Sequence, residues 1–307
     1  MILMTLIANA PNRSPKGSPN GSPKSSPKSS LKAWRQNNRR QQTITAIAIG
    51  SIFLLGIIVS PWFLGESGLT TVLTDRNQPP SWAHLFGTDW LGRDMLRRSL
   101  HGLSLSLRVG LLAASISAVI GTGLGLAAGT FGGWVDAVII WIVDVFFSLP
   151  HLVLLILIAF AVGGGTQGVI IAVALTHWTS LARVIRAEVL QLSNADYVQL
   201  SRHLGKPSLW IARHHMVPHI VPQLLVGLIL LFPHAILHEA ALSFVGIGLS
   251  PHLPAIGIIL AESMRHLSTG YWWLGVMPGV LLLISVKAFD WLGENVRSLL
   301  DPKTSQE

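Results

Sequence analysis

DYVQLSRHLGKPSLWIARHHMVP, residues 196–218, is a polar and basic stretch in a chain that is otherwise mostly apolar. A segment this polar cannot cross a hydrocarbon core of about 30 Å, so it must lie in water between two membrane spans. Gly205 and Pro207 separate two short helical patterns, and both patterns carry apolar side chains. These are Tyr197, Val198, Leu200, Leu204, Leu209, Trp210 and Ile211. Such a stripe outside the membrane needs a protein surface to cover it, which predicts a docking helix–turn–helix; the alternative is an ordinary cytoplasmic loop helix.

The composition places the whole chain among polytopic membrane proteins. Of 307 residues, 50% are hydrophobic and only 12% are charged, and the mean hydropathy is +0.54. A large soluble domain cannot be built from the remainder. The chain contains no cysteine, which excludes disulfides, thiolate metal sites and cysteine catalysis.

The net charge of +8 originates in residues 1–42, which hold eight basic residues and no acid. This excess marks a cytoplasmic end of a membrane protein and does not indicate a nucleic-acid partner. Within the segment, Ser-Pro recurs every four residues from Ser14 to Pro27. Because proline at that density blocks a helix and apolar residues are scarce, the tail is predicted to be disordered. A solvated tail and one that binds anionic membrane lipids are the two alternatives.

Six apolar runs predict six membrane spans, at about 43–64, 109–129, 137–162, 169–187, 219–244 and 271–286. The second span has a small-residue face suited to close helix contact, made of Gly121, Gly123, Gly125 and Gly129. Six spans put both termini on one side of the membrane. Fifteen basic residues flank the spans on the side of the tail and six on the other side, which predicts cytoplasmic termini and a cytoplasmic 196–218 stretch.

The chain is accordingly divided into five parts. A basic tail (1–42) and a first span (43–64) precede an extracytoplasmic loop (65–103). The core with the other five spans and the 196–218 loop follows (104–295), and a short cytoplasmic tail (296–307) ends the chain.

The 196–218 stretch resembles the coupling loop of ABC-importer permeases, whose pattern is Glu-Ala-Ala, three residues, Gly, nine residues and Ile-x-Leu-Pro. In this chain Gln199-Leu200-Ser201 stands where Glu-Ala-Ala is usual, Gly205 is the glycine of the pattern, and His215-Met216-Val217-Pro218 stands where Ile-x-Leu-Pro is usual. The resemblance implies contact with an ATPase through a set of five residues: Tyr197, Gln199, Ser201, Gly205 and Pro218.

Four further stretches resemble the dipeptide, oligopeptide and nickel branch of these permeases. They are GTDWLGRD (87–94), FGGWVDAVIIWIVDVFFSLP (131–150), EAALSFVGIG (239–248) and AFDWLGENVRSLLDP (288–302), and together the similarity covers nearly everything after residue 80. The resemblance implies an all-α type I ABC importer permease with six transmembrane helices and a cytoplasmic coupling helix, in a bacterial inner membrane.

The same resemblance implies the partners of the chain. They are a homologous second permease that forms a heterodimer with it, two ATP-binding subunits and an extracytoplasmic solute-binding protein. The sequence contains no GxxxxGK[ST] stretch, so ATP hydrolysis is expected in the partner subunits and not in this chain. No permanently bound cofactor is expected.

Two histidines in the fifth span indicate which cargo the protein carries. His234 and His238 lie four residues apart in the fifth span, so a helix places both imidazoles on one face, where they can share nickel, cobalt, copper or zinc. The nickel-carrying members resemble this chain at that place, which favours nickel or a related metal chelate over a dipeptide or oligopeptide. Glu239 and His151 are weaker candidates. A purely structural role of the histidine pair, a six-span channel and a membrane enzyme are further hypotheses.

Overall fold

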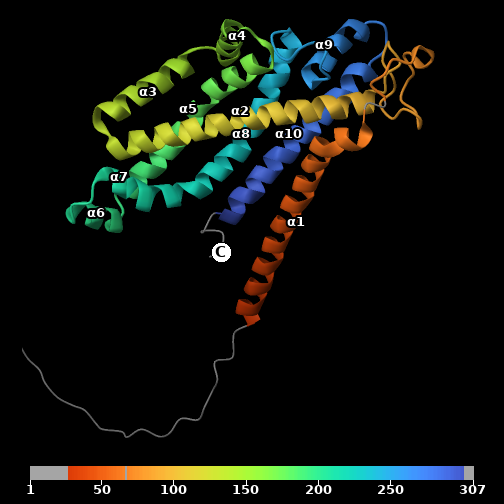
Figure 1. Ribbon diagram of the computed structural model, residues 1–307. Coiled ribbons are helices and arrows are strands. Elements are labelled where there is room, and N and C mark those ends of the chain that lie inside the picture. The colour runs from red at the N-terminus through yellow and green to blue at the C-terminus, as the bar shows by residue number, and fades with distance from the viewer. Residues whose placement is uncertain (1–26, 66–67, 301–307) are drawn as a thin grey trace, which may run out of the picture.

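The computed structural model describes residues 27–65 and 68–300. All regular elements of these residues are helical, apart from one isolated bridge between Thr88 and Asp94. In chain order (Figure 1) they are α1 (Pro27–Leu64), the 3-10 turn η1 (Leu73–Asp75), α2 (Met95–Phe131), α3 (Gly133–Ser148), α4 (His151–Ala161), α5 (Gly165–Ser193), α6 (Asp196–His203), α7 (Ser208–Ile211), the π-helical turn η2 (Ala212–Met216), α8 (Val217–Val245), α9 (Ile256–Leu267) and α10 (Trp273–Leu300).

The described helices include five that are long and apolar enough to cross a membrane: Gln41–Leu64 of α1, α2, α5, the continuous run Ser208–Val245, and α10. A sixth span results if α3 and α4 are taken together. The predicted all-helical polytopic fold is therefore confirmed.

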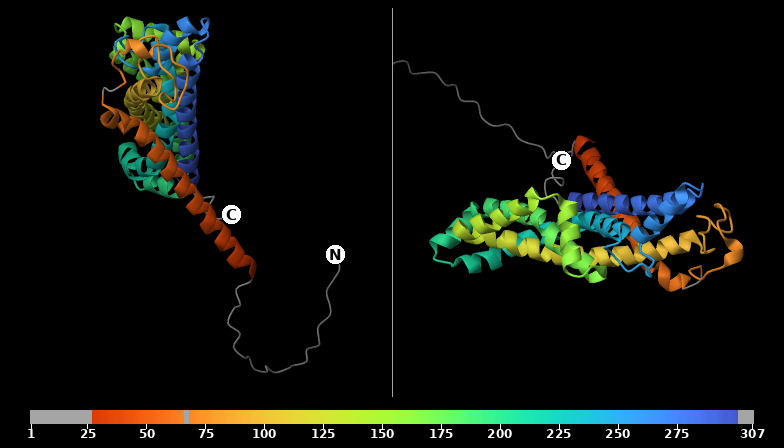
Figure 2. Two further views of the ribbon diagram at one scale, coloured as in Figure 1. Left: turned by 90° about the vertical axis from the view of Figure 1, so that its right-hand side faces the viewer. Right: turned by 90° about the horizontal axis from the view of Figure 1, so that it is seen from above.

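The two ends of the bundle are built differently. Figures 1 and 2 show α6 and α7 at one end, and α9 with the loop before α2 at the other. The start of α1 and the end of α10 both point toward the end that carries α6. The described part of the chain therefore begins and ends on the side of the bundle that carries the 196–218 stretch.

The core of the bundle is the contact between α2 and α5, which glycines of α2 make possible. A Cβ atom at Gly121 would lie 2.7 Å from the Trp178 carbonyl oxygen, and one at Gly125 would lie 2.5 Å from that of Ala182. At Gly129 the nearest atom is Val189 Cγ1, at 2.6 Å. Only glycine permits this approach of two helices. Gly123 has no atom within 4 Å of such a Cβ, so its predicted place on this face is wrong.

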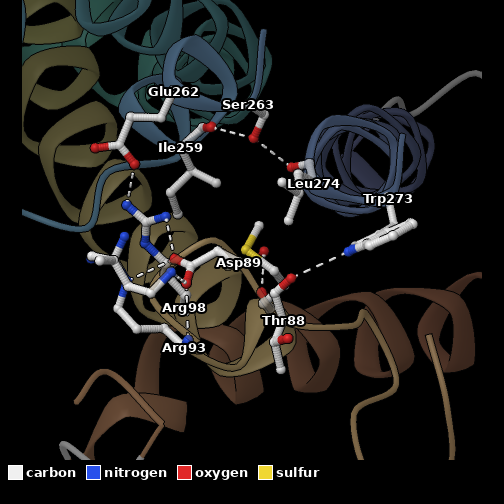
Figure 3. Close-up of polar contacts among 12 residues, drawn as sticks. Thr88, Asp89, Arg93, Arg98, Ile259, Glu262, Ser263, Trp273 and Leu274 are labelled. Carbon is white, nitrogen blue, oxygen red and sulfur yellow. Dashed lines mark hydrogen bonds and ion pairs between the residues drawn. The ribbon is translucent and has the colours of Figure 1, made fainter. Parts of the chain in front are cut away.

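At the end of the bundle away from α6 and α7, a buried ionic network holds the loop before α2 to α9 and α10 (Figure 3). The fully buried carboxylate of Asp89 accepts hydrogen bonds from Arg93 Nε at 2.7 Å and Arg98 Nη1 at 3.2 Å. Arg98 also pairs with Glu262 of α9, and Trp273 Nε1 of α10 donates to the Thr88 carbonyl oxygen at 3.3 Å. The GTDWLGRD sequence therefore builds a cap on this end that hydrogen bonds and ion pairs join to α9 and α10.

The first helix begins earlier than the sequence predicts. α1 starts at Pro27, so residues 27–42 are helical, although the sequence predicts a disordered tail up to residue 42. Pro27 fits the start of a helix, and after it the chain contains no proline until Pro61. Residues 1–26 of the predicted tail lie outside the described residues, as do residues 301–307 of the predicted C-terminal tail.

The third span is not one helix, as predicted for 137–162. α3 and α4 meet at an angle of 101° across Leu149 and Pro150. Pro150 lacks a backbone N–H and disfavours helical geometry at the preceding residue, and Leu149 is indeed extended, with φ −95° and ψ 142°. The break therefore follows from one proline.

The other predicted spans correspond to longer helices. α2 begins at Met95 and not near residue 109, because the Asp94 side chain accepts a hydrogen bond from the Arg97 backbone N–H at 3.0 Å and caps the helix. α10 extends to Leu300, beyond the predicted end at residue 286. The sequence prediction followed only the apolar segments, whereas the helices continue into polar residues at both membrane surfaces.

Candidate functional site

A cavity of about 540 Å³ opens between α3, α4, α5 and α8. Its walls combine aromatic and aliphatic side chains with neutral hydrogen-bonding groups. The lining includes Phe146, Phe147, Thr179, Ser180, Gln223, Leu230 and four histidines. Among the described residues, Arg297 of α10 is the one lysine or arginine that lines it. A cavity of this size and mixed polarity suits a small, partly polar ligand.

Three of the histidines meet at one wall of the cavity. His151 comes from α4, His177 from α5 and His238 from α8, and one ring nitrogen of each lies within 4.8 Å of the others. The ring centroids form a nearly equilateral triangle with sides of 4.9, 4.8 and 4.9 Å. His177 is 7% exposed and the other two are more open. We call these residues the histidine triangle.

The break in the third span positions His151. Because Leu149 and Pro150 end α3, His151 becomes the first residue of α4, and α4 packs back against α5 and α8. Sequence reasoning named His151 and His238 but missed His177. His177 could have been found from its place within an apolar span, because polar side chains inside spans usually face the interior of a bundle.

The two other predicted path residues, His234 and Glu239, are not part of the histidine triangle. His234 also lines the cavity, one helical turn before His238. Glu239 is fully buried on another face of α8, where its Oε1 accepts a hydrogen bond from Ser243 Oγ at 2.7 Å. The structure therefore brings His151 and His238 together with His177, and separates Glu239 from them.

The 196–218 stretch forms the predicted helix–turn–helix, with one difference. α6 ends at a turn where Gly205 adopts a left-handed φ of +76°, and α7 follows. The second helix does not end before Pro218, because Pro218 occupies the first turn of α8 and the helix runs from Ser208 to Val245. Pro218 lies two residues after the end of the π-helical turn η2, where the hydrogen-bond register of the run changes.

The apolar side chains of this stretch divide into an inner and an outer set. Val198 is fully buried and packs with Ile185, Val189, Ile211 and Met216. The outer set is exposed at the end of the bundle, and we call it the outer apolar surface. It consists of Tyr197 (47% exposed), Leu200 (60%), Leu204 (71%) and Leu209 (69%).

Two of the predicted coupling residues hold α6 in place. Gln199 Nε2 donates to the Ser193 carbonyl oxygen at 2.8 Å, and Ser201 Oγ lies 3.0 Å from His215 Nε2. Tyr197 also packs edge-on against His215, with ring centroids 5.4 Å apart. These contacts tie α6 to the end of α5 and to η2, so that a force on α6 reaches both long helices.

The chain is similar to known transport proteins. The family described as "Binding-protein-dependent transport system inner membrane component" matches residues 121–301. A dipeptide transport system permease protein, DppC of Bacillus subtilis, is 33% identical over 88% of this chain and 85% of its own length. A probable D,D-dipeptide permease of Escherichia coli K12 is 34% identical over 85% and 87%, and a glutathione permease of Pectobacterium atrosepticum is 33% identical over 88% and 91%.

Among solved structures, an inward-facing MetNI methionine ABC transporter has the same fold as this chain. It superposes with a TM-score of 0.53 at 21% identity and covers 67% of this chain and 98% of the other. By this family match and these relatives, the chain belongs to the binding-protein-dependent inner-membrane permeases of ABC importers, as a multi-pass, non-catalytic transport component whose relatives are named as peptide-type permeases.

Proposed function

We propose that this chain is one of two permease subunits of an ATP-driven importer of short peptides, and that the cavity between α3, α4, α5 and α8 is part of the translocation path. The observation that carries the proposal is the similarity at 32–37% identity over 83–89% of the chain to proteins named as dipeptide, oligopeptide, glutathione and other peptide permeases. The relatives thus favour a peptide cargo. The histidine pattern alone had suggested nickel.

The chemistry of the cavity suits a peptide. Thr179, Ser180 and Gln223 offer neutral donors and acceptors for amide groups, and Phe146 and Leu230 provide apolar contact for side chains. Such a lining binds the common peptide backbone without demanding one side chain. The exposed guanidinium of Arg297 can approach a terminal carboxylate.

The outer apolar surface of α6 and α7 is the proposed docking site of an ATP-binding subunit. Four large apolar side chains gathered on one exposed helical hairpin mark a protein interface. Gln199 and Ser201 act as internal ties, Gly205 forms the turn, and Pro218 begins the helix that carries the motion into the bundle. A rigid-body shift of α6 would then move α5 and α8, which border the cavity.

The position of the chain in the membrane follows from the same proposal. ATP-binding subunits are cytoplasmic, so the end with α6, α7, the start of α1 and the end of α10 faces the cytoplasm. The cap around Asp89 then faces the solute-binding protein on the other side. We also propose that a homologous second permease completes the path as a heterodimer.

A second candidate function is import of nickel or a related metal or metal chelate. The histidine triangle and His234 in the cavity favour it, because four imidazoles line the proposed path. It has no support in the names of the relatives, so it ranks behind peptide import.

Uptake in cells that express the whole transporter separates the two candidates. A labelled dipeptide, a tripeptide and nickel are offered in turn to cells that lack other peptide and nickel importers. The proposal expects binding-protein-dependent peptide uptake that stops when ATP is depleted. Nickel uptake without any peptide uptake would contradict it and establish the second candidate.

A further inference from the structure

We propose that His151, His177 and His238 form a binding site for a divalent transition metal ion of the nickel, copper and zinc class, with one coordination position open to the cavity. If the cavity is the peptide path, as proposed above, that open position selects peptides that can donate a terminal amine nitrogen to the metal.

The distances are close to those of a three-imidazole metal site. A tetrahedral ion at about 2.0–2.1 Å from each imidazole nitrogen holds those nitrogens roughly 3.3 Å apart. One ring nitrogen of each histidine lies within 4.8 Å of the others. His177 Nε2 also lies 3.1 Å from His238 Nδ1, a hydrogen-bond contact that shows how closely these two rings approach, although the metal-binding atom of His238 is its Nε2. To reach the spacing of a metal site, the three donor atoms must approach one another by up to about 1.5 Å from this arrangement.

Backbone carbonyls orient two of the rings. A carbonyl oxygen can only accept a hydrogen bond, so His177 Nδ1 donates to the Val173 oxygen at 3.0 Å. Its Nε2 is therefore the unprotonated atom, and it faces His238. His238 Nδ1 likewise donates to the His234 oxygen at 2.7 Å, which leaves His238 Nε2 free to bind a metal. Metal-binding histidines commonly have this arrangement, because the outer hydrogen bond fixes both the tautomer and the ring direction.

The donor set determines the class of metal. Three neutral imidazoles without a carboxylate or thiolate suit nickel, copper and zinc, whereas magnesium and calcium require oxygen ligands. Three protein ligands also leave a fourth position for a water molecule or a ligand. Since all three histidines line the cavity, that position lies where the cargo passes.

The direct test is metal binding to the purified complete importer after treatment with a chelator. Ni²⁺ and Zn²⁺ are titrated by calorimetry, bound metal is counted by mass spectrometry, and X-ray absorption reports the number of imidazole ligands. The variants are His151→Ala, which changes a partly exposed ring, and His177→Gln, which keeps a donor for the Val173 oxygen. His252→Ala, at an exposed loop position outside the cavity, is the matched control. Thermal unfolding checks that each variant is folded.

The proposal expects one ion per copy of this chain, bound through about three imidazoles. It expects affinity at least about tenfold weaker in His151→Ala and His177→Gln, and unchanged affinity in His252→Ala. A hydrogen-bonded imidazole cluster only, with no metal bound by the intact importer, would overturn it. So would a site lost in His234→Ala but retained in His177→Gln, because that result assigns the metal to the helical pair.

A second arm measures peptide binding to the same importer with and without bound metal. Metal binding requires no transport, so absent peptide uptake with a bound ion refutes the proposed function and leaves the metal site intact. Peptide uptake with no bound ion refutes the metal site alone. If metal binds but does not change peptide affinity, the open position has no role in selecting cargo, and that part of the inference is wrong.

Discussion

Asp89 is the most enclosed carboxylate of the cap on the outer end of the bundle. Besides the two arginines, its Oδ1 accepts hydrogen bonds from the backbone N–H groups of Leu91 and Arg93, both at 2.9 Å. One side chain therefore determines both the shape of the loop and its attachment to α2. Because the charge is buried and paired, its removal leaves Arg93 without this carboxylate and Arg98 with Glu262 alone.

The substitution Asp89→Asn tests this role. Breaking a buried ion pair costs about 3–5 kcal/mol, and we expect the lower end, because Arg98 keeps its pair with Glu262. The midpoint of thermal unfolding of the purified permease should fall clearly. The control is Asp290→Asn at the exposed pair of Lys287 and Asp290, 3.4 Å apart, where the expected loss is about 0–1 kcal/mol. Equal effects of the two variants would refute the role of burial.

The histidine triangle shows what a single sequence can predict at the scale of residues. His234 and His238 are four apart on one helix, so their common face was predictable from helical geometry. The contact of His151, His177 and His238 joins residues up to 87 positions apart, and it depends on the bend at Pro150. Helical periodicity contains no information about such a contact, which is why His177 was missed.

At the scale of elements, the packing of α2 on α5 depends on which glycines face α5. The spacing of Gly121, Gly125 and Gly129 by four residues keeps them on one face of α2, whereas Gly123 lies two residues away on another face. The sequence predicted a small-residue face, but a list of neighbouring glycines did not distinguish those in contact. The helical period alone makes this distinction.

The same substitution at two of these glycines should have opposite effects. Gly125→Ala places a methyl group against the Ala182 carbonyl oxygen and should destabilise the permease by about 1–3 kcal/mol. Gly123→Ala meets no atom and should be neutral or stabilise the helix by up to about 1 kcal/mol. Thermal unfolding of both variants measures the difference. A loss of stability in Gly123→Ala as large as in Gly125→Ala would contradict the assigned contact.

A second prediction at this scale concerns the outer apolar surface. Leu204→Asp puts a charge into the proposed interface and should weaken association with the ATP-binding subunits by about 2 kcal/mol or more, as at other interface centres. Co-purification of these subunits and peptide uptake should both decline, while the permease itself stays folded. Leu73→Asp, at a leucine that is 63% exposed at the other end of the bundle, is the matched control for ATPase association. Normal ATPase binding by Leu204→Asp would contradict the docking proposal.

For the whole molecule, composition and apolar runs were enough to predict a helical membrane protein, because hydropathy and span length directly reflect the bilayer. They were not enough for the path of the third span or for the start of α1. The path of the third span depends on the break at Pro150. The start of α1 lies in a polar sequence, and hydropathy does not report whether a polar sequence is helical. The cargo is harder still, since the histidines favoured metal and the relatives favour peptide.

The central claim is that peptide cargo passes through the cavity between α3, α4, α5 and α8. Because the chain has no natural cysteine, Ser180→Cys provides a single thiol at the exposed cavity wall. Ser268→Cys, at an exposed position after α9, is the control. Each variant is reconstituted with its partner subunits and reacted with a bulky maleimide, and ATP-driven peptide uptake is measured before and after. The account predicts that labelling at residue 180 abolishes uptake, that bound peptide slows the labelling, and that labelling at residue 268 changes neither. Full peptide uptake after complete labelling at residue 180 would contradict the account.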